Sequence, residues 1–540
     1  MNISALNQYH ERGAIRALLL ALLTISYYYL FIRVLYRVGD EGTLVYGAQR
    51  VLEGDLPYRD FFEVMGPASF YWLGLFFKLF GTHIWVARGL LLFTGLAMVL
   101  LIYWMTRRVY RGSFEMLPAL FYMVLAIPTW PATNHHWDSN LFALLALGAF
   151  FLWQDKGAWF YLVMVGVLAG ITSCFIQHKG LLVLLGLLLS LEVNDWRAGE
   201  SLRRHLTHSG LALGGYVVVG VIVLVFFFLA GGLPDLIYAN LIWPLTNYHN
   251  VNVVPYGYGL GELIYQMSWE PWLKLWLPAW AAFPAGVFLL GPFLIVLTLP
   301  LLILIFTVAS YFMPTNRPSL FNALLLPYWG VGLGLWLSEL HRKDIVHLVY
   351  GSPVVLILLL VVWNNCWGHR EVLRKLGLWL VSLSLLVYGV VHILEPLSAH
   401  QKIVTRRGTL YAFKADDALN FLQEETKPKE EVFIYPYYPM YYFLADIKNP
   451  SRYSILMYLI NTTKQFDEAI SSIKEKKVKY VLWDTLIEGK NIQLFFPNYR
   501  LLPDKELMLE QYLKQYYHMI GIKNGFRIMI RRNLENIPPG

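Results

Sequence analysis

The chain has 540 residues, of which 57% are hydrophobic and only 15% are charged. Soluble domains carry about 25% charged residues, so the composition excludes an ordinary soluble protein and predicts a polytopic α-helical membrane protein. The net charge of +8 does not indicate nucleic-acid binding, because many lysines and arginines fall in short loops between apolar segments. The two cysteines, Cys174 and Cys366, lie in or beside apolar segments and provide neither a disulfide framework nor a metal-ligand spacing.

The first apolar segment, residues 17–36, is too long and too aromatic for a signal peptide and has no small-residue cleavage site. We therefore predict that it is retained as a membrane span. A span needs about 20 mostly apolar residues, and on that basis the chain contains about eleven. The predicted transmembrane helices cover residues 17–36, 84–106, 114–128, 139–153, 158–176, 180–192, 210–231, 284–312, 319–339, 346–363 and 376–394.

The loops between these spans alternate in character. One set is mostly short and basic, and the positive-inside rule places it in the cytoplasm with the N-terminus; its basic residues include Arg107, Arg108, Arg111, Arg197, Arg203, Arg204, Arg317, Arg370, Arg374 and Lys375. The other set is predicted to face outward and comprises residues 37–83, 129–138, 177–179, 232–283, 340–345 and everything after 395. The unusual polar residues fall in this second set, whereas a transporter more often places its ionisable residues near the bilayer midplane. The pattern indicates a single extracytoplasmic site in a multi-pass protein of the plasma (inner) membrane.

The C-terminal region differs in composition from the rest of the chain. Helical patterns occur near residues 414–425, 464–476 and 506–518, and short strands are predicted near 431–435, 478–483 and 526–531. Alternating helices and strands are typical of a small α/β domain. We therefore divide the chain into a transmembrane module, residues 1–395, and an extracytoplasmic α/β domain, residues 396–540.

The first outward loop begins with two adjacent acids, Asp40 and Glu41. Residues 42–53 place their apolar side chains on one helical face, which predicts a helix lying flat in the membrane interface. Asp40 would then be the N-cap of this helix, with Glu41 at its positive end. The functional alternative is a carboxylate held at the water–lipid boundary as a general base. The two interpretations are compatible, because a capping acid is rigidly positioned.

The residues after this acidic pair carry a family resemblance. A turn contains Gly54, Pro57, Tyr58, Arg59, Asp60 and Phe61, and a Pro-led helix, Pro67 to Phe80, precedes Arg88. The pattern resembles the first outer loop of the GT-C membrane glycosyltransferases, of the protein O-mannosyltransferase and lipid A aminoarabinose transferase type. It covers roughly residues 15–200, and a double proline common in the family is Pro67-Ala68 here. The resemblance implies transfer of a sugar from a polyprenyl-phosphate carrier on the outer face of the membrane, with Asp40 as the catalytic carboxylate and Glu41 as its neighbour.

The second outward loop contains His135, His136 and Asp138. Imidazoles and a carboxylate suit zinc or manganese, but adjacent histidines cannot easily face one ion, so no metal site is assigned, although a divalent cation is compatible with the loop. The family resemblance implies that Asp138 helps to orient the acceptor or the sugar, with a solvated loop acid as the alternative. Lys179 ends a predicted span as either a snorkelling lysine or a ligand of the donor phosphate.

A further charged segment, HRKDIVH, starts the predicted span at 346–363. Arg342 could bind a phosphate bidentately, and Asp344 and His347, three residues apart, would share a helical face. An interfacial charge cluster is the alternative interpretation. Arg59, His136, Asp344 and His347 are therefore predicted to support the site, and Lys179 and Arg342 to bind the donor phosphate.

The sequence thus predicts an integral-membrane glycosyltransferase that moves a sugar from a polyprenyl-phosphate donor to an extracytoplasmic glycan, lipid or protein. Asp40 would be the base, and Asp138 would orient the acceptor or sugar. No nucleotide sugar is expected, because the chain has no glycine-rich dinucleotide loop, and neither is a nucleic-acid partner. The alternatives are a lipid or solute transporter or flippase, and a membrane scaffold whose C-terminal domain binds a partner.

Overall fold

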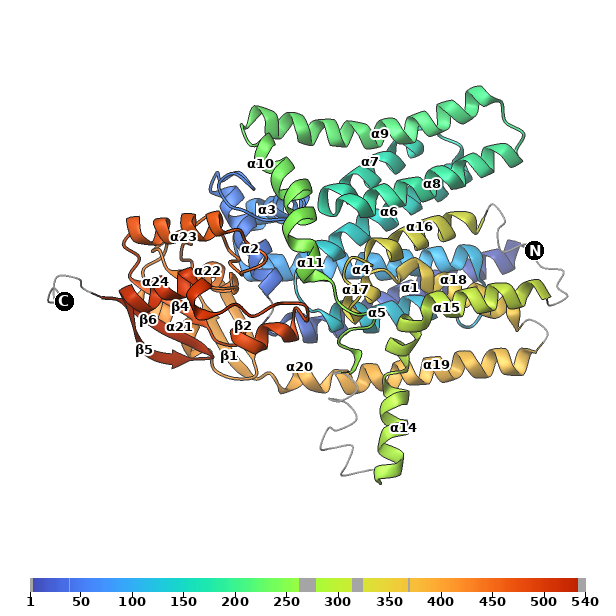
Figure 1. Ribbon diagram of the computed structural model, residues 1–540. Coiled ribbons are helices and arrows are strands. Elements are labelled where there is room, and N and C mark those ends of the chain that lie inside the picture. The colour runs from blue at the N-terminus through green and yellow to red at the C-terminus, as the bar shows by residue number, and fades with distance from the viewer. Residues whose placement is uncertain (1–2, 38, 262–277, 313–323, 368–369, 533–540) are drawn as a thin grey trace.

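The computed structural model describes residues 3–37, 39–261, 278–312, 324–367 and 370–532. A bundle of long helices carries a sheet-containing region at one end, and the N-terminus lies toward the opposite end (Figure 1). The short helices α2 and α3 lie between the bundle and the sheet-containing region. This arrangement brings the first outer loop and the C-terminal region together.

The bundle is built from apolar helices, and within a helix the backbone N–H and C=O groups hydrogen-bond to each other, as a membrane span requires. Its helices are α1 (Ile3–Ile32), α4 (Ile84–Val109), α5 (Leu117–Thr129), α6 (His135–Lys156), α7 (Phe160–Phe175), α8 (Gln177–Arg197), α9 (Leu202–Leu229), α14 (Ala279–Leu289), α15 (Gly291–Phe312), α16 (Leu326–Ser338), α18 (Pro353–Cys366) and α19 (Glu371–His392).

Within the described part of the chain, five stretches of helix are long and apolar enough to cross a membrane: residues 11–32, 84–109, 202–229, 291–309 and 371–398. The other predicted spans also coincide with helices, but these are shorter or carry polar residues, so the count of about eleven stays a prediction. The predicted span 284–312 is divided into α14 and α15 at Leu290. Part of the predicted span 319–339 lies outside the described residues.

Short helices cover the end of the bundle that faces the C-terminal region. The predicted interfacial helix at 42–53 is α2 (Gly39–Leu52), and the Pro-led helix is α3 (Ala68–Phe80), with Pro67 at its N-cap position. The remaining short elements are α10 (Leu233–Ile237), the π-helical turns η1 (Tyr238–Ile242) and η2 (Pro244–Tyr248), α11 (His249–Asn252), α17 (Ile345–Tyr350) and α20 (Leu394–Ser398).

The C-terminal region contains a hairpin and a four-stranded sheet. The hairpin pairs β1 (Gln401–Thr405) with β2 (Gly408–Ala412). The sheet has the order β3-β4-β6-β5, in which β3 (Phe433–Tyr435) is parallel to β4 (Tyr480–Asp484), and β6 (Phe526–Arg531) is antiparallel to both β4 and β5 (Tyr517–Lys523). The helices are α21 (Asp417–Glu425), α22 (Met440–Leu444), α23 (Thr463–Glu475) and α24 (Met508–Tyr516), with 3₁₀ turns η3 (Gly489–Leu494) and η4 (Asp504–Glu506). The three predicted helices and three predicted strands are confirmed, whereas β1, β2, β5 and α22 were not predicted.

One hydrophobic core joins α2, α3 and the start of α4 to the C-terminal region. Tyr46 of α2 stacks on Tyr442 of α22, with ring centroids 5.0 Å apart. Phe62 of the first outer loop donates its backbone N–H to the carbonyl of Arg452 at 2.8 Å. The first outer loop and the C-terminal region therefore pack as a single unit, and residues at their junction hold fixed positions relative to each other.

Candidate active site

The predicted acidic pair lies in the first turn of α2, because the helix begins at Gly39. The prediction that Asp40 caps a helix starting at residue 42 is therefore wrong: Asp40 is inside the helix, where its charge still favours the positive end of the helix dipole. Its carboxylate is half-buried, and Oδ1 accepts a hydrogen bond from the phenol of Tyr437. Among the described residues no donor contacts Oδ2, which leaves one oxygen of this carboxylate available for chemistry.

Glu41 points in another direction and forms a buried ion pair. Its Oε2 lies 2.6 Å from Nη2 of Arg88, and the two side chains are 1% and 0% exposed. Oε1 accepts the backbone N–H of Thr133 at 3.1 Å, and Arg88 also donates to the carbonyl of Pro131 at 2.6 Å. Burial raises the pKa of Glu41, and the charge of Arg88 opposes that rise. Glu41 thus ties α2 to α4 and to the second outer loop, which suits a structural role better than a reacting one.

Asp138 lies in the first turn of α6 and is buried, so it is not a solvated loop acid. Thr94 of α4 donates its hydroxyl to Oδ1 of Asp138 at 3.0 Å. The helix is capped one turn earlier by Asn134, whose side chain accepts the backbone N–H of His136 at 2.9 Å. This cap fixes where α6 begins and therefore turns both His136 and Asp138 into the protein.

Lys179 is completely buried near the start of α8, which rules out a snorkelling side chain. Its ammonium group donates to the hydroxyl of Ser139 at 3.0 Å and to Oδ1 of Asn140 at 2.9 Å. It also lies 2.6 Å from Oε1 of Glu339, a carboxylate that is 1% exposed. Three protein acceptors therefore share the three N–H donors of this lysine.

Glu339 is the centre of a cluster of titratable side chains. Nδ1 of His136 lies 3.1 Å from Oε2 of Glu339, and the ring of His136 stacks on Tyr350, with centroids 4.5 Å apart. His347 lies against both rings, with centroids 5.0 Å from that of His136. We define the buried-carboxylate cluster as the following residues: His136, Lys179, Glu339, His347 and Tyr350.

The segment HRKDIVH completes this cluster. Asp344 caps α17 by accepting the backbone N–H of His347 at 3.0 Å. Its Oδ1 also lies 2.7 Å from Nδ1 of His347, as the spacing of three residues predicts. Arg342 donates to Asp344 at 2.7 Å, to Oδ1 of Asn252 at 2.5 Å and to the carbonyl of Phe495 at 2.8 Å. The segment therefore forms specific contacts between the bundle and the C-terminal region, and it is more than an interfacial charge cluster.

Asp40 lies close enough to the buried-carboxylate cluster for its charge to interact with Tyr350 of that cluster. Its charge acts on Tyr350 and on Glu63, a buried carboxylate of the first outer loop. Burial raises the pKa of Glu63 to about 8. Three buried polar atoms in this neighbourhood have no hydrogen-bond partner among the described residues: Oε1 of Glu63, Nδ1 of His135 and the hydroxyl of Tyr350. Buried polar groups are normally paired, so these atoms indicate a place for a polar ligand.

Arg59 is not part of this arrangement. It forms a bidentate pair with Asp60, with distances of 2.8–2.9 Å, and donates to the carbonyl of Ala230 at the end of α9 at 2.9 Å. Its guanidinium therefore joins the first outer loop to α9, and its contacts are with the protein surface.

The buried-carboxylate cluster also contains a candidate set of metal ligands. One ligand atom from each of His136, Glu339 and His347 lies within 4.8 Å of the others. Two imidazoles and a carboxylate suit zinc. The set fits a cation, which would sit beside the ammonium of Lys179.

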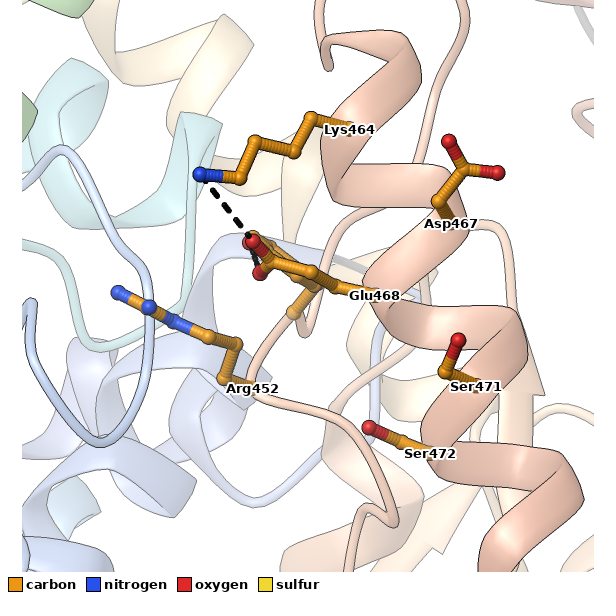
Figure 2. A pocket seen from close by; sticks show the side chains of 7 residues that line it. Arg452, Lys464, Asp467, Glu468, Ser471 and Ser472 are labelled. Atoms are coloured by element: carbon orange, nitrogen blue, oxygen red, sulfur yellow. Dashed lines mark hydrogen bonds and ion pairs between the residues drawn. The ribbon is translucent and has the colours of Figure 1, made fainter.

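A separate hollow of about 420 Å³ lies on the C-terminal region. Figure 2 shows Lys464 extending toward Glu468 and Arg452 extending away from it, while Asp467, Ser471 and Ser472 lie along α23. Both basic residues of the hollow have carboxylate partners: Lys464 lies 4.0 Å from Glu468, which also lines it, and Arg452 lies 3.8 Å from Asp235, which does not. None of the predicted site residues lines it, so we do not assign the active site there.

Sequence reasoning missed Glu339, Glu63 and Tyr437. Glu339 carried a signal, because a single carboxylate at the end of the apolar segment 326–338 must have a partner when it is buried. Glu63 lies within the loop that resembles the GT-C pattern, but its burial cannot be read from its neighbours. Tyr437 contacts Asp40 across 397 residues of sequence, and no local pattern indicates such a contact.

No protein-family model and no curated protein sequence matches the chain. Solved structures match it over nearly its whole length. The oligosaccharyltransferase AglB from Archaeoglobus fulgidus, in complex with an inhibitory peptide and a dolichol-phosphate, is 13% identical with a TM-score of 0.50; the match covers 97% of this chain and 75% of AglB. ArnT from Cupriavidus metallidurans, bound to undecaprenyl phosphate, is 14% identical with a TM-score of 0.51, over 98% of this chain and 99% of ArnT.

The chain has the GT-C fold. A further structure of the A. fulgidus enzyme, in complex with Zn and sulfate, matches with 13% identity and a TM-score of 0.51, over 94% of this chain and 73% of that chain. At these identities the likeness establishes the fold, and it confirms the fold resemblance seen in the first outer loop. The apolar helices of the described residues indicate a multi-pass membrane protein.

Proposed function

We propose that this GT-C chain is a membrane glycosyltransferase that takes a sugar from a polyprenyl-phosphate donor and transfers it to an extracytoplasmic acceptor. The observation that carries the proposal is the environment of Asp40. A half-buried carboxylate with one unengaged oxygen stands at the end of the helical bundle, beside buried polar atoms that lack partners. The structural neighbours that contain dolichol-phosphate and undecaprenyl phosphate support the choice of donor.

In this proposal Asp40 acts as the general base. The free oxygen of Asp40 accepts the proton of an acceptor hydroxyl. At the same time the oxygen of that hydroxyl forms a bond to the anomeric carbon of the donor sugar. The bond between the anomeric carbon and the phosphate oxygen breaks, and the electron pair leaves with polyprenyl phosphate. Asp138, held by Thr94, orients the sugar or the acceptor from the start of α6.

The departing phosphate needs a positive partner as its charge develops. We assign this contact to Arg342, which is 17% exposed and can exchange one of its three protein acceptors for a phosphate oxygen. Lys179 is 0% exposed and is shared by three acceptors, so we assign it the role of holding Glu339 and the start of α6 in place. His136, Glu339 and His347 would hold a divalent cation, which would supply Lewis-acid stabilisation of negative charge when bound.

The proposal also specifies the transferred sugar, the acceptor and the side of the membrane. The transferred group is a hexose or a pentose, and the acceptor is a glycan, a lipid or a protein. Asp40, the buried-carboxylate cluster and the region from residue 396 onward face outward from the plasma (inner) membrane. The alternating basic loops support this orientation, because the arginines at residues 107–111 lie at the opposite end of α4 from Arg88 and Glu41.

The test is a transfer assay with purified protein in detergent or vesicles. Polyprenyl-phosphate sugars of several kinds are supplied, and the release of polyprenyl phosphate is measured with and without candidate acceptors. Asp40→Asn should lower the turnover by about a hundredfold or more, because an amide cannot take up the proton. Asp416→Asn is the matched control: Asp416 caps α21, and asparagine caps a helix about as well as aspartate. Equal turnover in the wild-type protein and the Asp40→Asn variant would contradict the proposal.

A further inference from the structure

Among the described residues of the C-terminal region, the side chain of Tyr437 contacts the proposed base. Tyr437 lies between β3 and α22, and its phenol donates a hydrogen bond to Oδ1 of Asp40. Among the described residues, Tyr437 donates to Oδ1 of this carboxylate and no donor contacts Oδ2. A donor that engages one oxygen restricts rotation of the carboxylate and directs the other oxygen toward the substrate.

Two glycines in α2 make this contact possible. A Cβ atom on Gly39 would lie 2.3 Å from the ring of Tyr437, and a Cβ atom on Gly42 would lie 2.1 Å from the backbone nitrogen of Met440. Residues three apart share one face of a helix, so these glycines form a bare face on which the segment 437–440 rests. Any larger side chain on this face would displace the segment that carries Tyr437.

The position of Tyr437 is fixed by packing on both sides of it. The Tyr46–Tyr442 stack described above holds α22 on α2, and the hydroxyl of Tyr46 accepts the backbone N–H of Asn449 at 2.9 Å. Tyr438, the next residue, packs edge-to-face on Tyr441 with centroids 4.6 Å apart. Tyr437 is therefore presented to Asp40 by a rigid segment, so its hydroxyl stays at the carboxylate.

We propose that Tyr437 is the positioning residue for Asp40, so that the C-terminal region completes the active site. The inference rests on the proposed function, because it concerns the base of that reaction. The phenol holds one oxygen of Asp40 by its hydrogen bond, while the other oxygen receives the acceptor's proton. The other titratable groups near Asp40 are Glu63 of the first outer loop, Tyr350 of α17 and Glu41, which Arg88 neutralises.

The test compares two tyrosine-to-phenylalanine substitutions in the full-length protein. Tyr437→Phe removes the hydrogen bond to Asp40, whereas Tyr441→Phe removes a similar bond, 2.7 Å long, to Asp416 within the C-terminal region. We expect Tyr437→Phe to lower kcat about 10- to 100-fold, the effect of losing a hydrogen bond to a charged group. The KM for the acceptor should stay near the wild-type value, and the acidic limb of the pH–rate profile should move to higher pH. Tyr441→Phe should leave both the kcat and the pH–rate profile at their wild-type values.

A second measurement does not depend on turnover. A water-soluble carbodiimide with an amine modifies carboxyl groups in their protonated form, and peptide mass spectrometry reports the modification of Asp40 as a function of pH. Tyr437→Phe should shift this modification curve to higher pH, and Gly39→Ala, which displaces the ring of Tyr437, should do the same. Because this readout needs no substrate, it separates a failure of the inference from a failure of the proposed function.

Three outcomes would overturn the inference. One is a modification curve for Asp40 that is the same in the wild-type protein and in Tyr437→Phe. Another is a kcat and pH–rate profile of Tyr437→Phe that match those of Tyr441→Phe. The third is a rise in the KM for the acceptor with an unchanged kcat, because it would make Tyr437 a contact of the acceptor and not of Asp40.

Discussion

The ion pair between Glu41 and Arg88 offers a decisive test of which acid in the first outer loop is structural. Both side chains are essentially unexposed and lie 2.6 Å apart. Arg88→Met would leave the Glu41 carboxylate with the backbone N–H of Thr133 at 3.1 Å as its described donor. Removing one partner of a buried ion pair costs about 3–5 kcal/mol, whereas replacing both partners is often close to neutral.

We therefore expect Arg88→Met to lower the free energy of unfolding by about 3–5 kcal/mol, and Glu41→Gln to lower it by a similar or smaller amount. The double variant Glu41→Gln/Arg88→Met should recover most of this loss, because glutamine still accepts from Thr133 and no charge remains buried. The measurement is unfolding of the purified protein in mixed micelles, followed by circular dichroism, for the wild-type protein and all three variants. The transfer rate is determined per folded molecule in the same samples.

If Glu41 is structural, the double variant should transfer sugar at close to the wild-type rate. A second substitution can restore packing, but it cannot restore a reacting carboxylate. A double variant that is folded but as inactive as Asp40→Asn would refute this reasoning and would assign Glu41 to the chemistry. A double variant that is as unstable as Arg88→Met would show that the pair contributes more than the neutralisation of buried charge.

The remaining predictions concern pH, metal, phosphate and topology. Glu63 has a pKa raised from 4.5 to about 8, so the folded protein keeps this proton while the unfolded chain loses it near pH 4.5; stability should fall by about 5 kcal/mol between these pH values, and Glu63→Gln should flatten this dependence in thermal unfolding measured against pH. Zinc titration of chelator-treated protein should give about one bound ion per chain, and His347→Ala should abolish it; binding that survives this substitution would exclude the site. Arg342→Ala should weaken binding of polyprenyl phosphate in a stable protein, whereas Lys179→Ala should lower stability by about 3–5 kcal/mol; equal lipid affinity in Arg342→Ala and wild type would contradict the phosphate contact. A C-terminal epitope should be accessible from outside sealed cells, and a protected epitope would reverse the predicted orientation.

Much of the architecture could be predicted because it depends on local patterns. Apolar stretches mark the helices of the bundle, and periodicity marks α2, α21, α23 and α24. The start of α2 was misplaced because glycine is a poor helix former, so Gly39 suggests a residue outside the helix. In the structure Gly39 packs closely against Tyr437, and a larger side chain would not fit there. This constraint comes from a distant part of the chain.

The candidate site was only partly predictable for the same reason. Asp40, Asp138, Lys179 and His347 could be chosen because polar residues at span ends stand out against their apolar surroundings. Their partners could not be chosen. Glu339 meets Lys179 across 160 residues of sequence, and its other neighbour, His136, is 203 residues away. Chemical types along a sequence indicate which residues need partners, but only the three-dimensional packing of the helices selects them.

The contact between Asp40 and Tyr437 has a consequence for biosynthesis. The two residues are 397 positions apart, and ribosomes add about 5–20 residues per second, so about 20–80 s separate their synthesis. During that time the bare glycine face of α2 has no partner and the base has no fixed orientation. A chain that terminates before residue 437 would insert most of its helices and still lack an ordered carboxylate. Asp40 therefore gains its hydrogen-bond partner only after residue 437 has been made, and under the proposed function a prematurely ended chain would lack an ordered base.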